Sequence, residues 1–125
     1  MGKPYKISMN LIVIRSKNIE KSLEFYKAIG LSFIKEKHGS GPEHYSSTIN
    51  NLVFEIYPII DNNKGNNNIR IGFNISSLDD VVNLLSKKGF EIVSEAKNSC
   101  WGRRAVMKDY DNYTVELIDK KTKKR

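Results

Sequence analysis

The chain has 125 residues, a formal net charge of +7 and a single cysteine, Cys100. This length allows one domain with its own hydrophobic core, and one cysteine excludes an internal disulfide. The N-terminus lacks the apolar stretch of a signal peptide and no apolar run is long enough to cross a bilayer, so we expect a cytoplasmic protein with no membrane partner.

Much of the positive charge lies in a basic tail at 120–125, which reads KKTKKR. Removing its five charges lowers the net charge from +7 to +2. A nucleic-acid surface places basic residues among aromatic and polar groups on a folded face, whereas a charged terminus is typical of a solvated tail. We therefore expect no nucleic-acid partner.

An internal repeat aligns residues 18–36 with residues 77–95 without a gap. Each copy opens with a residue whose side chain is predicted to cap a helix, Asn18 or Ser77, and Asp80 adds a variant of the capping box. Each predicted helix ends at a glycine, Gly30 or Gly89. The apolar positions between these ends follow helical spacing and are Ile19, Leu23, Tyr26 and Ile29 in one copy and Leu78, Val81, Val82 and Leu85 in the other.

Strand-like segments surround both predicted helices. They are LIVIRS (11–16), LSFIKE (31–36) and LVFEIYP (52–58) in the first half and RIGFNI (70–75), FEIVSE (90–95) and YTVELID (113–119) in the second. A polar linker at 61–68 separates a module at 7–60 from a module at 69–120. The predicted fold is therefore one α+β domain of two repeated β-α-β-β-β modules, whose sheets form an incomplete barrel or cup.

Alternation along the strands separates two faces of each sheet. One face is predicted to pack on the helices, through Ile12, Ile14, Phe54, Ile56, Ile71, Phe73, Ile75, Val115 and Leu117. The other is mixed, and its acids Glu55 and Glu116 occupy matching positions of the two halves. A concave mixed surface with a few charged groups indicates a small-molecule site, although an ordinary solvated sheet face is the alternative. The predicted cleft residues are Leu11, Glu55, Tyr57, Arg70, Asn74, Trp101 and Glu116.

Two segments, NIEKSLEFYKAIGL at 18–31 and WGRRAVMKDYDNYTVEL at 101–117, resemble motifs of the vicinal oxygen chelate superfamily. That superfamily includes glyoxalase I, bleomycin-resistance proteins, extradiol dioxygenases and fosfomycin-resistance enzymes. The resemblance covers the whole chain and implies the paired-module fold and a homodimer. It leaves open whether the chain is an enzyme, because the superfamily holds enzymes of several classes and proteins that only bind drugs.

In metal-dependent members of that superfamily, a His on the first strand and a Glu on the last strand of each half hold one divalent metal. The resemblance places Glu55 and Glu116 at the acid positions but Leu11 and Arg70 at the histidine positions, where neither can bind a metal. It therefore favours a cofactor-free protein, similar to antibiotic-resistance members, that binds a small molecule in a metal-free cleft between the modules. Arg70 would then pair with both acids.

The alternative function is a metal-dependent lyase, similar to lactoylglutathione lyase, or a dioxygenase. Ni²⁺ or Zn²⁺ would then bind Glu55 and Glu116 together with a third ligand, for which Asn10 is the nearest donor. The sequence identifies neither the ligand nor a reaction, and it does not decide whether the cleft lies within one chain or across two.

Three further residues carry weaker signals. His38 and His44 flank the turn GSGPE, fit no helical ligand spacing and are expected to be solvated. Cys100 has no base beside it in the sequence and is expected to be a packing residue.

Overall fold

The computed structural model describes residue 9, residues 11–59 and residues 69–120. The predicted linker at 61–68 and most of the basic tail lie outside these ranges. The first module contains β1 (Leu11–Ser16), α1 (Ile19–Ala28), β2 (Ile34–Glu36), β3 (His44–Ile49) and β4 (Leu52–Pro58). The second contains β5 (Arg70–Asn74), α2 (Leu78–Lys87), β6 (Ile92–Ser99), β7 (Gly102–Lys108) and β8 (Thr114–Asp119).

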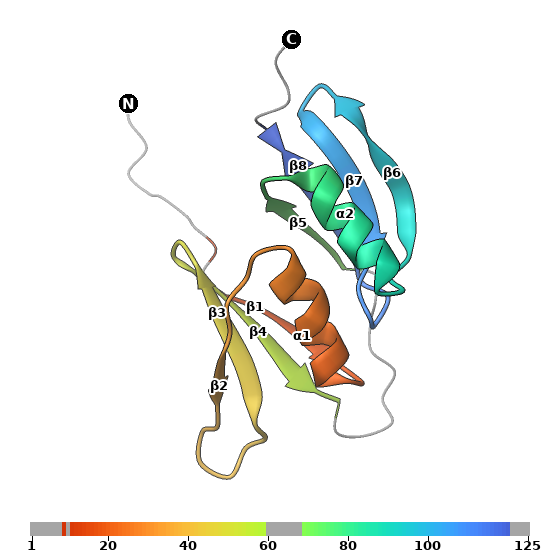
Figure 1. The fold of residues 1–125 in the computed structure, drawn as a ribbon. Helices are drawn as coiled ribbons and strands as arrows, with labels where there is room; N and C mark the ends of the chain where they lie inside the picture. The colour runs from red at the N-terminus through yellow and green to blue at the C-terminus, as the bar shows by residue number, and fades with distance from the viewer. Residues whose placement is uncertain (1–8, 10, 60–68, 121–125) are drawn as a thin grey trace, which may run out of the picture.

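Each module is built on a four-stranded mixed sheet with the same topology. The strand orders are β1-β4-β3-β2 and β5-β8-β7-β6. The first and last strands of each module are parallel, and the other neighbours are antiparallel. Figure 1 shows the modules side by side, with α1 and α2 on the same side of the molecule. The predicted α+β fold of two β-α-β-β-β modules is confirmed.

One hydrophobic core joins the two modules. The predicted helix-facing residues all belong to it, because Ile14, Phe54, Ile56, Ile71, Val115 and Leu117 are buried and Ile12, Phe73 and Ile75 pack against them. The Phe54 and Phe73 rings, one from each module, meet edge to face with centroids 6.0 Å apart. Burial of these side chains is the main force that holds the modules together.

The helix ends agree with the sequence in three of four cases. The Asn18 side chain accepts a hydrogen bond from the Lys21 amide at 3.1 Å, as predicted for a cap. Gly30 and Gly89 follow the two helices with φ of +119° and +97°. Glycine takes such angles without the clash that a Cβ atom would cause, so both helices end where the sequence indicates.

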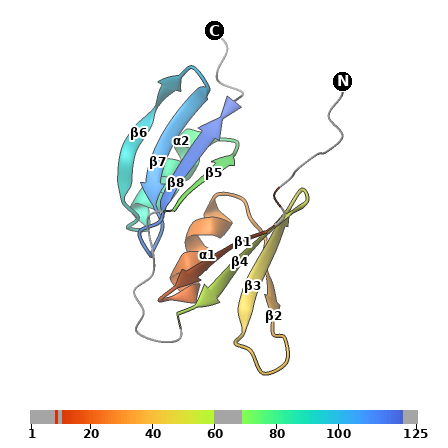
Figure 2. The same cartoon turned by 180° about the vertical axis from the view of Figure 1, so that it is seen from behind.

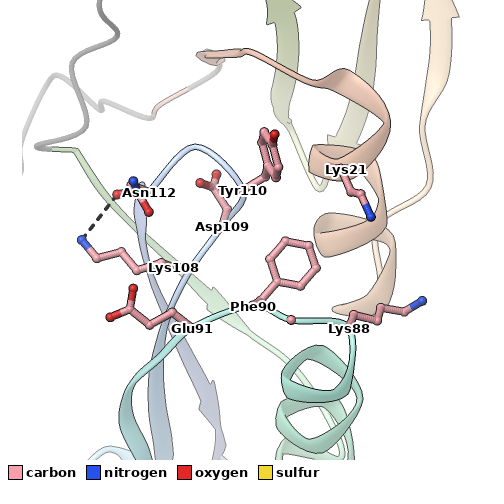
Figure 3. A pocket seen from close by; sticks show the side chains of 9 residues that line it. Lys21, Lys88, Phe90, Glu91, Lys108, Asp109, Tyr110 and Asn112 are labelled. Atoms are coloured by element: carbon pink, nitrogen blue, oxygen red, sulfur yellow. Dashed lines mark hydrogen bonds between the residues drawn. The ribbon is translucent and has the colours of Figure 1, made fainter.

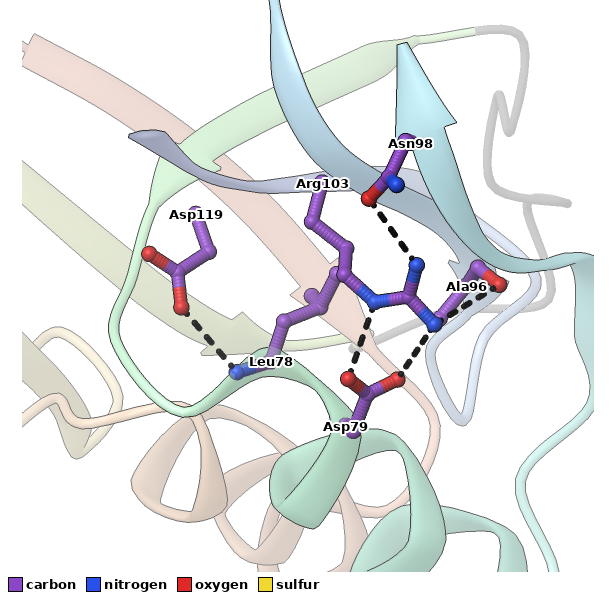
Figure 4. Close-up of polar contacts among 6 residues, drawn as sticks. All are labelled: Leu78, Asp79, Ala96, Asn98, Arg103 and Asp119. Atoms are coloured by element: carbon purple, nitrogen blue, oxygen red, sulfur yellow. Dashed lines mark hydrogen bonds and ion pairs between the residues drawn. The ribbon is translucent and has the colours of Figure 1, made fainter. Parts of the chain in front are cut away.

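The fourth end, at Ser77, corrects a prediction. Ser77 has left-handed angles, φ 57° and ψ 48°, and its side chain caps nothing. Instead, the Leu78 amide at the start of α2 donates to Asp119 Oδ2 at 3.4 Å (Figure 4). The carboxylate at the end of β8 therefore takes the place of the serine, because the helix starts against that strand end.

The strand β2 is shorter than the predicted segment 31–36. Leu31 and Phe33 pack against the core, and regular pairing with β3 begins only at Ile34. Neither α1 nor α2 is long and apolar enough to cross a membrane.

Candidate functional site

The predicted cleft residues on the strands lie on the sheet faces that no described helix covers. Figure 2 views the molecule from behind, so these faces are toward the viewer and the helices lie on the far side. Glu55 lies opposite Val13 in the first sheet, and Glu116 lies opposite Gly72 in the second. The repeat-related acids therefore occupy equivalent places on two faces that turn to the same side, which we call the open faces.

Glu116 is held by two arginines. Arg104 Nε lies 2.7 Å from Glu116 Oε2, and Arg70 Nε lies 3.4 Å from Oε1. The hydrogen bond from Arg104 is the largest cause that lowers the pKa of Glu116 below its ordinary value, and the Arg70 contact acts in the same direction. Glu116 is thus an ionised carboxylate with fixed cationic neighbours.

This arrangement corrects the predicted pairing of Arg70 with both acids. Arg70 pairs with Glu116, while Glu55 forms no ion pair within the described part of the chain. Sequence reasoning missed Arg104, the closer partner. Arg104 lies on β7 opposite Ile118 and therefore diagonal to Glu116. This neighbourhood depends on the register between β7 and β8, which the sequence pattern alone does not give.

The residues at the position where metal-dependent members of the similar superfamily bind a metal do not fit one. Leu11 offers no donor atom and is half-exposed, and Arg70 directs its guanidinium to Glu116. Two guanidinium groups beside Glu116 would repel a divalent cation. Asn10, the candidate third ligand, lies outside the described residues.

A polar row crosses the first sheet from β1 to β2. Arg15 Cζ lies 5.2 Å from the centre of the Tyr57 ring, which stacks on His44 at 4.2 Å and 6°. Glu36 Oε1 lies 3.2 Å from His44 Nε2. His44 is only 1% exposed, so the prediction that it is solvated is wrong. It is the first residue of β3 rather than part of the turn, and its ring stacks on Tyr57 of the neighbouring strand. His38 is exposed, as predicted, and its ring centre lies 5.1 Å from that of His44.

Three other residues lie near strand ends. Trp101 is 60% exposed at the turn between β6 and β7, where its amide donates to Ser99 Oγ at 3.1 Å. Cys100 in the same turn is also exposed, so its predicted packing role is wrong. Asn74 is exposed at the end of β5. Contact of Trp101 or Asn74 with a ligand stays a prediction.

A cavity lined by described residues lies away from the open-face acids, between α1, the loop after α2 and the β7–β8 turn (Figure 3). Its volume is about 330 Å³, and its lining includes Lys21, Phe90, Lys108, Asp109 and Tyr110. A smaller cavity of about 240 Å³ lies beside the start of α2 around Arg103 and Asp119. Neither contains a predicted cleft residue.

Asp109, in the wall of the larger cavity, anchors the modules to each other. Tyr26 Oη donates to Asp109 Oδ2 at 2.7 Å, and the amides of Asp111 and Tyr113 donate to Oδ1, each at 2.9 Å. Burial is the largest cause that raises the pKa of Asp109, to about 6. Because its acceptors are occupied by protein donors, the geometry gives Asp109 a structural role.

Comparisons with known proteins agree with this architecture. Residues 8–117 match the Glyoxalase/Bleomycin resistance protein/Dioxygenase superfamily. A glyoxalase family protein from Bacillus cereus is similar in structure, with a TM-score of 0.70, 18% identity and coverage of 94% of this chain and 96% of the other. A hypothetical protein from S. aureus is also similar, with a TM-score of 0.69, 21% identity and coverage of 90% of this chain and 96% of the other.

A third similar structure is TnmS3, described as an antibiotic binding protein from Streptomyces sp. CB03234. Its TM-score is 0.67 at 17% identity, with coverage of 91% of this chain and 96% of TnmS3. At these identities the structural likeness establishes the fold alone. No curated protein matched the sequence.

Proposed function

This chain belongs to the Glyoxalase/Bleomycin resistance protein/Dioxygenase superfamily, and we propose that it binds a small molecule in a metal-free cleft formed by its open faces. The observation that carries the proposal is the Arg70–Glu116–Arg104 cluster on the second open face. The antibiotic-binding description of TnmS3 makes antibiotics a reasonable first ligand class.

The charges of the cluster favour a ligand with an acidic group. Two guanidinium groups surround one carboxylate, so the cluster carries a net charge of +1. Both arginines bond Glu116 through Nε, and their terminal nitrogens make no hydrogen bond to another described residue. A carboxylate or phosphate group can accept from these planar donors.

Gly72 leaves space for a ligand beside this cluster. It lies opposite Glu116 on β5, and a Cβ atom at Gly72 would have only one heavy atom, the Glu116 carbonyl oxygen at 3.9 Å, in its surroundings. That distance is an ordinary contact, so a Cβ atom fits at Gly72, and a side chain built on it would extend over the open face beside Glu116. Gly72→Val is therefore a blocking variant that leaves the cluster itself intact.

Thermal unfolding of the full chain tests the proposal with a panel of aromatic and aliphatic carboxylic acids, antibiotics among them. Each acid is paired with its neutral carboxamide. At a ligand concentration of about 100 Kd, binding stabilises the folded state by about 2.7 kcal/mol, which is a rise of several degrees in Tm. We expect such a rise with at least one acid and none with its amide.

Variants then locate the site. Arg104→Gln and Gly72→Val should abolish the rise. Arg103→Gln should retain it, because Arg103 faces α2 and pairs with Asp79 Oδ2 at 2.9 Å (Figure 4). A panel without any stabilising acid, or a rise that survives Arg104→Gln, would contradict the proposal. Mass spectrometry of the recovered ligand separates binding from turnover.

We also propose that a second copy of the chain covers the open faces. Ile34 and Leu11 are 66% and 51% exposed on the first of these faces, where apolar side chains favour a partner. Light scattering should give a dimer mass for the wild type and a monomer mass for Ile34→Glu. Leu84→Glu, on the exposed side of α2, is the control that should stay dimeric. The cytoplasmic location stays a prediction.

A further inference from the structure

Three side chains that the sequence does not link to a ligand meet at the β2–β3 hairpin. Glu36 ends β2, His44 begins β3, and His38 lies in the turn between them. Glu36 Oε1 lies 3.2 Å from His44 Nε2 and 3.7 Å from His38 Nε2. One ligand atom from each residue lies within 4.8 Å of the other two. We call this group the hairpin triad.

His44 supplies the strongest sign of a ligand. The residue is 1% exposed, and its Nε2 is buried without a hydrogen-bond partner among the described residues. Nε2 does lie 3.2 Å from Glu36 Oε1, within ion-pair distance for a protonated imidazole, but no hydrogen bond joins the two atoms. A buried polar atom left in this way costs free energy unless something else binds it.

The neighbours of His44 fix the orientation of its ring. Nδ1 lies 3.3 Å from the Pro42 carbonyl oxygen. A carbonyl can only accept, so a proton belongs on Nδ1, and in the neutral form of the ring Nε2 carries the lone pair. Stacking on Tyr57 at 4.2 Å holds the ring plane. Metal-binding histidines are commonly oriented by such a bond from the second ring nitrogen.

Two of the three distances within the hairpin triad are close to those of a metal site, and the third is within 4.8 Å. Ligand atoms at 2.0–2.1 Å from Zn²⁺ in a tetrahedron lie about 3.3 Å from each other. The contacts of 3.2 Å and 3.7 Å from Glu36 Oε1 are close to that spacing. Two imidazoles and one carboxylate form a ligand set that suits Zn²⁺ and leaves a fourth position open.

We propose that Glu36, His38 and His44 bind one divalent transition-metal ion, of which Zn²⁺ is the type. The ion would cross-link the two strands of the hairpin through the turn between them, and its fourth position would take water or an exogenous donor. Because His38 is exposed, it would close the site after Glu36 and His44 have been positioned by strand pairing.

This site is separate from the pair of repeat-related acids. Glu55 and Glu116 have equivalents in both modules, whereas the hairpin triad lies in the first module only. The corresponding turn between β6 and β7 carries Cys100 and Trp101 instead. The proposal is also independent of the acidic ligand, whose anchors, Arg70 and Arg104, belong to the second sheet.

Calorimetric titration with Zn²⁺ tests the proposal on the full chain, purified without a histidine tag and stripped with a chelator. We expect one ion per chain and a higher Tm with Zn²⁺. Co²⁺ in place of Zn²⁺ should give the visible absorption of a four-coordinate site. His38→Ala should weaken Zn²⁺ binding roughly 100-fold or more, because removal of supporting groups alone costs up to that factor.

Matched variants make the result decisive. Since His44 is buried, its replacement can disturb folding. The test therefore uses the exposed His38→Ala and the isosteric Glu36→Gln, each of which should weaken Zn²⁺ binding. Glu43→Gln should not change the affinity, because Glu43 is in the same hairpin but pairs with Lys35 at 3.4 Å. Absence of stoichiometric Zn²⁺ at micromolar concentration, or affinity unaffected by His38→Ala, overturns the proposal. Loss of binding in Glu55→Gln or Cys100→Ser overturns it too.

Discussion

Glu116 is an acid within an otherwise apolar strand, and its neighbours explain why the strand tolerates it. Val115 and Leu117 point into the core, so Glu116 points to the open face. There its side chain is 23% exposed and contacts Arg104 and Arg70. Partial solvation and two cationic partners remove most of the cost of placing a charge on a sheet.

Replacement of each arginine should change the pKa of Glu116 unequally. Arg104→Gln should raise this pKa toward the ordinary value more than Arg70→Gln, because the Arg104 contact is 2.7 Å and the Arg70 contact is 3.4 Å. Arg70 is also 52% exposed, so water screens it more strongly. NMR titration of the Glu116 carboxyl carbon measures both shifts. A larger effect of Arg70→Gln would contradict the geometry.

The helices α1 and α2 start in different ways although their sequences align. Asn18 caps α1 with its own side chain, whereas the start of α2 receives Asp119 from β8. The second solution depends on a residue 41 positions away. A local sequence pattern therefore predicts where α2 starts, but not which group satisfies its first amide.

Substitutions at the two helix starts should have opposite effects on stability. Asn18→Ala should lower the free energy of unfolding by about 1 kcal/mol, because a capping bond is lost. Ser77→Gly should raise it by about 0.5–1 kcal/mol, because Ser77 caps nothing and its φ of 57° favours glycine. Urea denaturation measures both values. Destabilisation by Ser77→Gly would indicate that the serine side chain does cap α2.

At the scale of the whole molecule, contacts of α1 and of Lys17 just before it with the second module hold the two repeats in one body. The Phe25 and Phe90 rings meet with centroids 5.1 Å apart, and Tyr26 donates to Asp109 at 2.7 Å. The Lys17 amide donates to Asp111 Oδ1 at 2.8 Å. The Asp-x-Asp turn at 109–111 thus joins the second module to the first.

The buried carboxyl of Asp109 should make stability depend on pH. Its pKa of about 6 exceeds the ordinary 3.8, so the folded protein binds more protons between these values. The stabilisation from protonated Asp109 is therefore complete below about pH 4 and is lost as the pH rises through about 6. The loss amounts to roughly 2–3 kcal/mol at most, since each pKa unit corresponds to 1.36 kcal/mol.

Asp109→Asn isolates this contribution, because the amide keeps the shape and cannot titrate. The stability of the wild type relative to Asp109→Asn should decrease between pH 4 and pH 7 in urea denaturation. Asp79→Asn, at an exposed pair with Arg103, is the control without a buried carboxyl. A difference between wild type and Asp109→Asn that does not vary with pH would show that Asp109 has an ordinary pKa.

The sequence by itself determined the two modules, the order of their elements and the apolar face of each sheet. These features follow from local rules, because helical spacing, strand alternation and glycine at a helix end act within a few residues. The repeat doubled each signal, and for that reason Glu55 and Glu116 were predicted on the correct face.

The tertiary structure decided which groups meet. Glu116 pairs with Arg70 and Arg104, whereas the predicted group was Arg70 with Glu55 and Glu116. Asp119 rather than Ser77 caps α2, and His44 is buried rather than solvated. Each outcome depends on strand register or on the packing of distant segments, which single-residue patterns do not encode. The hairpin triad follows the same rule, since pairing of β2 with β3 places Glu36 opposite His44.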